Sequence, residues 1–274
     1  MIKPLTHTLV LISLAACGGG GGGSDDSGGS NNGGSGDQGL PGFADANATG
    51  TVSLSAVSLD SGNRSTSALT GTLDRDQDTL NLGDLSGDIN NDRSEVTLDG
   101  GGQILLTAGA NEYSRFFDAT PSGDNRTIGI VGILATNTPT SGDVTYNGTS
   151  MLTIQEGVDI YDLTGTSNVQ ANFGDGLVTS TIDDLSGTQR TGLTGSVQVN
   201  DVATITFSGS EIDGTTFSGG TVEMTSDTIT ALSDSAQSSL NGAFFGPDAA
   251  ETGGAFVIND ADDDATILGT FIAN

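Results

Sequence analysis

The chain is built from short runs of Val, Ile, Leu and Thr that are interrupted every few residues by Gly, Asp or Asn. In residues 51–55 the apolar side chains of Val52 and Leu54 alternate with hydroxyl side chains, and residues 202–207 alternate in the same way. This period of two is typical of a β-strand with one buried face. Because turn-forming residues separate the runs at short spacing, the pattern predicts antiparallel strands joined by hairpins, as in a sandwich or a barrel.

Strands are expected along most of the chain after residue 44, and helix is expected only as one or two turns within residues 232–240. The further strand candidates are residues 127–134, 144–154, 160–173, 177–185, 215–224, 243–245, 254–258 and 265–272. About eight antiparallel strands close into a barrel that side chains can fill, and closure removes edges that could aggregate. We therefore predict an all-β protein with a hairpin-rich, handle-like region at 44–110 and an antiparallel barrel of about eight strands at 111–274.

The supply of reactive side chains is small. Hydrophobic residues make up 34% of the 274 residues, and the usual share is approached only when the 43 Gly are added. The single His is His7, and the basic residues are Lys3 and six arginines. If residues 1–16 are removed, no imidazole or lysine remains for a Ser-His-Asp triad, a Schiff base or a P-loop. An enzyme is not expected; the alternative is a pair of buried Asp or Glu side chains with raised pKa in one cavity.

Acidic side chains dominate the charge, with 35 Asp and Glu against 7 Lys and Arg, a net charge of -28. Nucleic acid is excluded as a partner because phosphate binding requires a basic face. A solvated acidic surface that maintains solubility is the first interpretation, and attraction of cations or of a basic partner is the second. Residues 74–78 and 260–264 concentrate carboxylates, but neither has the Gly at position six or the Glu at position twelve of an EF-hand loop. We expect tight acidic turns, with weak Ca²⁺ binding as the alternative, and no cofactor or metal site.

The N-terminus has the features of a secretory signal at residues 1–16: a basic Lys3, an apolar stretch at 9–14 and then small residues. The sequence Leu-Ala-Ala-Cys that ends at Cys17 resembles the bacterial lipobox. That resemblance implies cleavage before Cys17 and its lipidation, and Gly18 at the second position implies the outer membrane; an ordinary secreted protein is the alternative. Residues 17–43 comprise this Cys and a Gly-, Ser- and Asp-rich linker, a flexible tether of roughly 25–30 Å.

The segment 242–256 reads Gly-Ala-Phe-Phe-Gly-Pro-Asp-Ala-Ala-Glu-Thr-Gly-Gly-Ala-Phe. It resembles a signature of the transferrin-binding protein B-like β-barrel surface lipoproteins, a solute-binding family. Segments at 138–148, 172–182 and 269–273 resemble other family motifs in the same order, although Asn172 and Ser180 depart from the family's usual Asp and Gly. The signature residues are Gly242, Phe244, Phe245, Gly246, Pro247, Glu251, Gly253, Gly254 and Phe256.

We expect the signature to form a corner of the barrel. Gly246 and Pro247 should end a strand, because Pro has a fixed φ and no N–H to donate. Gly253 and Gly254 should let the backbone turn into the next strand.

The aromatic residues of the signature are expected to serve packing. Phe244 and Phe256 should lie on neighbouring strands as core anchors, with Phe245 facing outward. We interpret the motif as structural, and the alternative is that the Glu251 carboxylate has a chemical role.

The resemblance implies surface lipoproteins that acquire metals or haem by binding host or environmental carriers, often after export by an outer-membrane translocator. The best-known members are larger and bilobed, whereas this sequence predicts one barrel. We expect a monomeric, lipid-anchored outer-membrane or cell-surface binding protein that acts in metal, haem or solute acquisition through an external carrier. The alternative is a structural or adhesive acidic lipoprotein whose barrel is packed with side chains and holds no small molecule.

Overall fold

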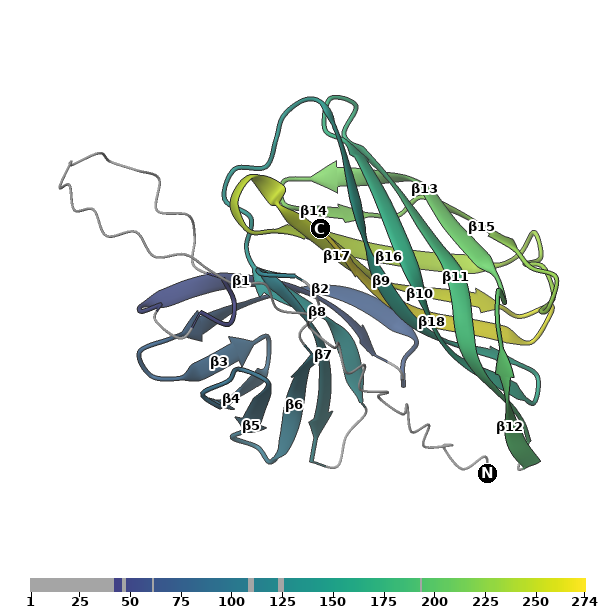
Figure 1. Cartoon of the computed structure of the whole chain (residues 1–274), viewed down its shortest axis with the longest axis horizontal. Coiled ribbons are helices and arrows are strands. Elements are labelled where there is room, and N and C mark those ends of the chain that lie inside the picture. The colour runs from purple at the N-terminus through teal and green to yellow at the C-terminus, as the bar shows by residue number, and fades with distance from the viewer. Residues whose placement is uncertain (1–41, 46–47, 61, 108–110, 123–125, 193) are drawn as a thin grey trace, which may run out of the picture. The chain divides into compact units, whose positions relative to one another are not determined.

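The computed structural model describes residues 42–274 except 46–47, 61, 108–110, 123–125 and 193. The first eight strands pair in sequence order, and β8 returns to pair with β1, so that they form a closed antiparallel barrel (Figure 1). These strands are β1 (Thr51–Asp60), β2 (Ser65–Asp74), β3 (Thr79–Leu82), β4 (Leu85–Ile89), β5 (Glu95–Leu98), β6 (Gly102–Thr107), β7 (Ser114–Pro121) and β8 (Thr127–Ile133).

The remaining ten strands form a second sheet in the order β12-β11-β10-β9-β18-β17-β16-β14-β13-β15. An additional pairing between β11 and β13 closes eight of them into a barrel, while β12 and β15 each extend along one of these two strands. The strands are β9 (Asp143–Glu156), β10 (Asp159–Asn172), β11 (Leu177–Thr191), β12 (Thr194–Val199), β13 (Thr204–Asp213), β14 (Thr216–Ser218), β15 (Thr221–Thr225), β16 (Gln237–Phe245), β17 (Glu251–Asp260) and β18 (Ala265–Ala273). The predicted all-β fold with an eight-stranded antiparallel barrel is confirmed.

The N-terminal region differs from the small handle that we expected at 44–110, because it is itself a closed barrel. Strands β7 and β8, which we had placed with the C-terminal barrel, close this first one. The reason lies in their alternating side chains: Phe117 and Val131 fill the first lumen, whereas Phe116 and Ile130 pack against strands of the second barrel. Both faces of β7 and β8 are buried, so their apolar side chains serve the first lumen on one face and the contact with the second barrel on the other.

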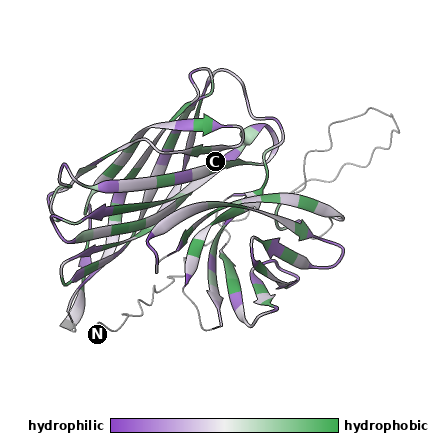
Figure 2. Cartoon of the chain, turned by 180° about the vertical axis from the view of Figure 1, so that it is seen from behind, coloured by the Kyte–Doolittle hydropathy of each residue, from purple (hydrophilic) through white to green (hydrophobic). Residues whose placement is uncertain are grey.

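Three apolar clusters form the core of the protein. One fills the first lumen, a second fills the lumen of the C-terminal barrel, and a third lies between β1, β7 and β8 on one side and β16, β17 and β18 on the other. Hydrophobic and hydrophilic residues alternate along the strands in Figure 2, as the period-two sequence pattern predicts.

The helical turns expected at 232–240 are not present. Residues 237–240 belong to β16, and the loop before them is tied to the end of β17 by Ser233, whose backbone N–H and hydroxyl both donate to the Asp260 carboxylate at 2.6 Å. Within the described part of the chain the helical element is a single 3-10 turn, Pro247–Ala249. No helix in that part is both long and apolar enough to span a membrane.

Both acidic segments form tight turns. The Asp74 carboxylate accepts the backbone N–H groups of Asp76 and Gln77 at 3.0 and 3.1 Å, and Asp260 accepts that of Asp262 at 3.3 Å. Hydrogen bonds from Ser233 and from this turn lower the pKa of Asp260, since they stabilise its charged form. Among the described residues no group of three His, Cys, Asp or Glu side chains could hold a metal ion.

Candidate functional site

The signature segment forms a corner between β16 and β17. β16 ends at Phe245, Gly246 has a φ of 73°, and Pro247 begins the 3-10 turn that leads to β17. A Cβ at Gly246 would lie 2.6 Å from the Tyr113 ring, so glycine is required both by the positive φ and by this close approach. Gly246 and Pro247 thus lie where the strand ends.

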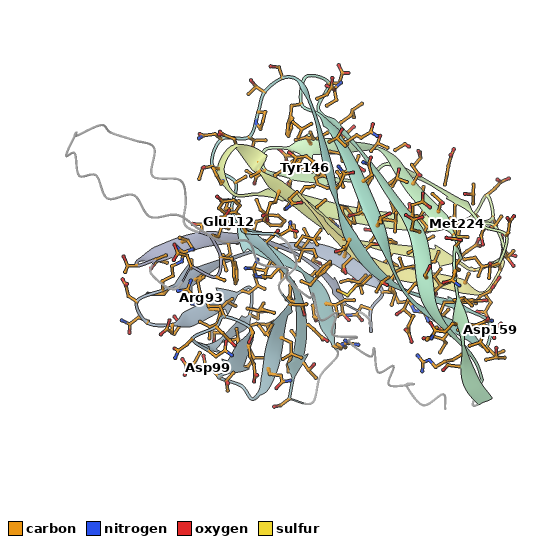
Figure 3. The ribbon with its side chains drawn as sticks, in the orientation of Figure 1. Arg93, Asp99, Glu112, Tyr146, Asp159 and Met224 are labelled. Atoms are coloured by element: carbon orange, nitrogen blue, oxygen red, sulfur yellow. The ribbon has the colours of Figure 1, made fainter. Side chains whose placement is uncertain are left out.

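A buried tyrosine fixes this corner to β9. The Tyr146 hydroxyl donates to the carbonyl oxygen of Ala249 at 2.8 Å (Figure 3 labels Tyr146). Burial raises the pKa of Tyr146 to about 12, because the phenolate would lose its hydration. The phenol therefore stays protonated and keeps its donor over the physiological range.

Two signature aromatics face the second lumen. Phe244 lies on β16 with ring centroids 5.2 Å from Phe173 and 5.4 Å from Phe217, and Phe256 on β17 lies 5.2 Å from Phe207. The three ring pairs are tilted, with interplanar angles of 47°, 49° and 56°, and so avoid the face-to-face stacking that aromatic pairs disfavour. The structure therefore places Phe244 and Phe256 on neighbouring strands within one core.

Gly253 and Gly254 do not turn the chain, contrary to the expectation from sequence, because both lie inside β17. A Cβ on Gly254 would come within 2.6 Å of the Phe271 ring on β18, and a Cβ on Gly253 would lie 3.1 Å from Ile130 of the first barrel. These glycines permit close approach of neighbouring groups on the two faces of the strand.

Glycine opposite phenylalanine recurs around this lumen. Gly242 pairs with Phe217 across β16 and β14, and Gly269 pairs with Phe256 across β18 and β17. A Cβ on Gly242 would lie 2.0 Å from the Phe217 ring, and one on Gly269 2.3 Å from the Phe256 ring. Each ring therefore covers the glycine of the neighbouring strand, a device that also stabilises designed barrels.

Phe245 faces away from the second lumen, yet it is fully buried. It belongs to the apolar cluster between the barrels. A Cβ on Gly132 of β8 would lie only 2.5 Å from the Phe245 ring, so this contact requires glycine at position 132. Residue Leu134 forms an isolated antiparallel bridge with Phe245. The outward-facing aromatic of the signature thus serves the contact between the barrels.

Glu251 lies at the start of β17 with only 3% of its surface exposed. Its carboxylate accepts the backbone N–H groups of Glu112 and Tyr113 at 2.5 and 3.1 Å, and the Ser114 hydroxyl at 2.6 Å. We call this arrangement of Glu251 with residues 112–114 the clasp. It binds the second barrel to the segment that enters β7 of the first, a partner that no sequence motif indicated.

The carboxylate pair that an enzyme would need is not formed by the buried acidic residues. Among the described residues, the buried carboxylates are Glu251 and Asp260, which stand at opposite ends of β17. The eight strand residues between them correspond to a separation of roughly 30 Å, against about 5–9.5 Å between the carboxylates of glycosidases. The remaining predicted site residue, Cys17, lies outside the described residues.

These features define a protein of two closed, packed β-barrels. Residues 138–274, half of the chain, match the family described as the C-lobe and N-lobe β-barrels of transferrin-binding protein B. The chain therefore belongs to this family, as its signature predicted. The family is one of binding proteins and not of enzymes.

Two solved structures of transferrin-binding protein B have a similar fold. A mutant of the vaccine antigen transferrin-binding protein B from Haemophilus parasuis is 20% identical with a TM-score of 0.55, over 81% of this chain and 44% of that one. Intact Ap-TbpB, with its N and C lobes, is 18% identical with a TM-score of 0.50, over 81% and 45%. The apo haemoglobin receptor HpuA from Kingella denitrificans is 12% identical with a TM-score of 0.40, over 88% and 92%.

The chain spans less than half the length of the two transferrin-binding proteins that it matches. Among curated proteins no sequence matches it significantly.

Proposed function

We propose that the protein is a lipid-anchored protein of the outer membrane and cell surface that binds an external carrier in the acquisition of a metal, haem or another solute. Membership of the transferrin-binding protein B barrel family is the observation that carries the proposal. The lipobox-like sequence before Cys17 and the Gly-rich segment after it support an anchor followed by a tether.

The packing of the second lumen favours a macromolecular carrier over a small ligand held inside the barrel. Six phenylalanines lie in its core, together with Leu, Ile and Val side chains. Small molecules bind in concave sites with room for most of their surface, whereas proteins bind one another over broad external patches. Binding on the outside of the barrels is therefore the proposed mode.

The structurally similar proteins suggest the kind of carrier. Their descriptions name transferrin and haemoglobin, both iron-containing proteins. A net charge of -28 favours a partner with a basic surface, since complementary potentials speed association and suppress wrong partners.

A structural or adhesive surface protein is the second candidate, and the same packed lumen favours it. In that case the acidic exterior serves the cell envelope and no carrier is bound. Pull-down from growth medium or host serum separates the two, because only the first function predicts a stoichiometric, salt-sensitive partner.

The anchor is tested by growing cells with labelled palmitate. We expect label on the wild-type protein and none on Cys17→Ala, which removes the acceptor thiol. An unlabelled wild-type chain would contradict the anchor.

The location is tested by protease treatment of intact cells, with a periplasmic protein as the control for lysis. Cleavage supports exposure on the cell surface and capture of an external carrier. Protection would place the barrels in the periplasm and would remove the external carrier from the proposal.

A further inference from the structure

The N-terminal part of the described chain enters the first barrel through a single aromatic side chain. Phe43, which the sequence assigned to the tether, is fully buried and packs in the apolar cluster of the first lumen with Leu54 and Phe117. Phe43 lies eight residues before the start of β1, so it enters the core without being part of a strand.

Polar contacts hold the backbone on both sides of this ring. The Phe43 N–H donates to the Glu112 carbonyl oxygen at 2.8 Å, and the Phe43 carbonyl oxygen accepts Arg93 Nη1 at 3.0 Å. The carbonyl oxygen of Gly42 accepts Arg75 Nη2 at 2.9 Å. The Arg115 guanidinium lies 5.6 Å from the centroid of the Phe43 ring.

Three of the six arginines in the chain are thus committed to two residues. Arg75, Arg93 and Arg115 are each only 5–6% exposed, and burying a guanidinium is unfavourable unless its donors are bonded. Burial lowers the pKa of Arg75 and of Arg115, but guanidinium groups stay charged in proteins. The Gly42 and Phe43 carbonyl groups therefore supply acceptors to two buried guanidinium groups, those of Arg75 and Arg93.

The same contacts continue into the clasp. The Glu112 backbone joins Phe43 to the clasp, because its carbonyl oxygen accepts the Phe43 N–H while its own N–H donates to the Glu251 carboxylate (Figure 3 labels Glu112 and Arg93). Arg115 Nη1 also donates to the carbonyl oxygens of Asn111 and Ser114, at 2.5 and 2.7 Å. Residues 111–115 are therefore bonded to the N-terminal segment on one side and to the second barrel on the other.

We propose that Gly42 and Phe43 form a latch that holds the clasp closed, so that the N-terminal segment is fixed where the two barrels join. A pull on the chain before Gly42 then acts on both barrels through residues 111–115. It does not act first on β1, whose pairing with β2 and β8 closes the first barrel. The latch thus protects the strand that a tethered protein would otherwise lose first.

Amide hydrogen exchange of the full chain tests the latch. In Phe43→Ala we expect the Glu112 and Tyr113 amides to exchange at least tenfold faster, because the clasp opens locally. Amides in the β9–β10 hairpin should change much less. The matched control is Phe207→Ala, which removes an equally buried ring from the second lumen and should leave Glu112 and Tyr113 close to their wild-type rates.

Wild-type exchange at Glu112 and Tyr113 in Phe43→Ala would overturn the proposal, and so would an equal acceleration of all amides, which indicates only a global loss of stability. Phe43→Leu keeps an apolar side chain in the core and covers the case in which the alanine variant does not fold. It should show a smaller acceleration at the same two amides, and unchanged rates there would likewise overturn the latch.

Discussion

At the scale of single residues, Glu251 connects sequence signature and structure most directly. Its buried carboxylate receives three hydrogen bonds from residues 112–114, and bonds to a charged acceptor are stronger than those between neutral groups. In Glu251→Gln we expect a loss of about 1–3 kcal/mol in the free energy of unfolding, measured by urea denaturation. The control is Glu223→Gln on an exposed position of β15, which should change stability by less than about 0.5 kcal/mol. Equal effects in the two variants would contradict the clasp.

Tyr146 gives the corner a pH dependence. Its pKa is raised from the ordinary value of 10.0 to about 12, so the unfolded chain releases the phenol proton at lower pH than the folded one. The stabilisation is therefore complete below pH 10 and is lost as the pH rises towards 12, by at most about 2.7 kcal/mol for a difference of two pKa units.

The chain has 3 Tyr and no Trp, so phenolate absorbance reports these residues without interference. We expect the last phenol to titrate in the wild-type protein to be missing in Tyr146→Phe, and the decline in stability above pH 10 to be shallower. Tyr113 and Tyr161, whose pKa values burial also raises, remain in the variant as internal references. If the titration curve of Tyr146→Phe had a lower amplitude but the same shape as that of the wild-type protein, Tyr146 would not be the last phenol to titrate.

At the scale of strands, the alternation of side chains predicted the elements but not every role within them. Glycine in a sequence is usually taken to indicate a turn, yet Gly253 and Gly254 lie inside a strand. Only the pairing of strands shows that a phenylalanine or a first-barrel side chain occupies the space of their missing Cβ atoms. Phe43 was missed for a related reason, because one aromatic at the end of a Gly-rich stretch has no periodic neighbours to indicate burial.

The glycine–phenylalanine pairs can be tested with matched alanine variants. Gly242→Ala places a methyl group 2.0 Å from the Phe217 ring, and we expect a loss of about 1–3 kcal/mol from overpacking. Gly195→Ala in β12 meets no heavy atom within 4 Å and should be neutral or slightly stabilising. Thermal unfolding followed by circular dichroism compares them. If Gly242→Ala were as stable as Gly195→Ala, the ring would not need the glycine.

At the scale of the whole molecule, the sequence predicted a barrel from the signature and missed the second one. The missing information was the contact between the barrels, which buries both faces of β7 and β8 and gives them a composition similar to that of core strands. The clasp was equally invisible, because Glu251 and residues 112–114 are far apart in sequence and one partner is backbone. Family membership, by contrast, was predicted, since ordered Gly, Pro and Phe positions are a local property of the chain.

The charge of the molecule leads to a prediction for the whole fold. In the described residues all six arginines hold structural contacts: three lie around the latch, and the others bond Thr266, Asp118 and Asp162. The acidic side chains at the surface therefore have few cations to balance them, and their mutual repulsion destabilises the compact state. Salt screens this repulsion, with a Debye length that falls from about 30 Å at 0.01 M to about 10 Å at 0.1 M.

We expect the melting temperature to rise by several degrees between roughly 0.01 and 0.5 M NaCl, as the Debye length shortens. A variant with Asp88→Asn, Asp213→Asn and Asp227→Asn removes three exposed charges, and it should melt at higher temperature in low salt and depend less on NaCl. Sucrose is the control, because it is excluded from the surface of any protein and should raise the melting temperatures of the wild-type protein and the variant equally. A melting temperature that is independent of salt would show that the acidic surface is already neutralised, for example by bound cations. That outcome would also remove the electrostatic reason for choosing a basic partner.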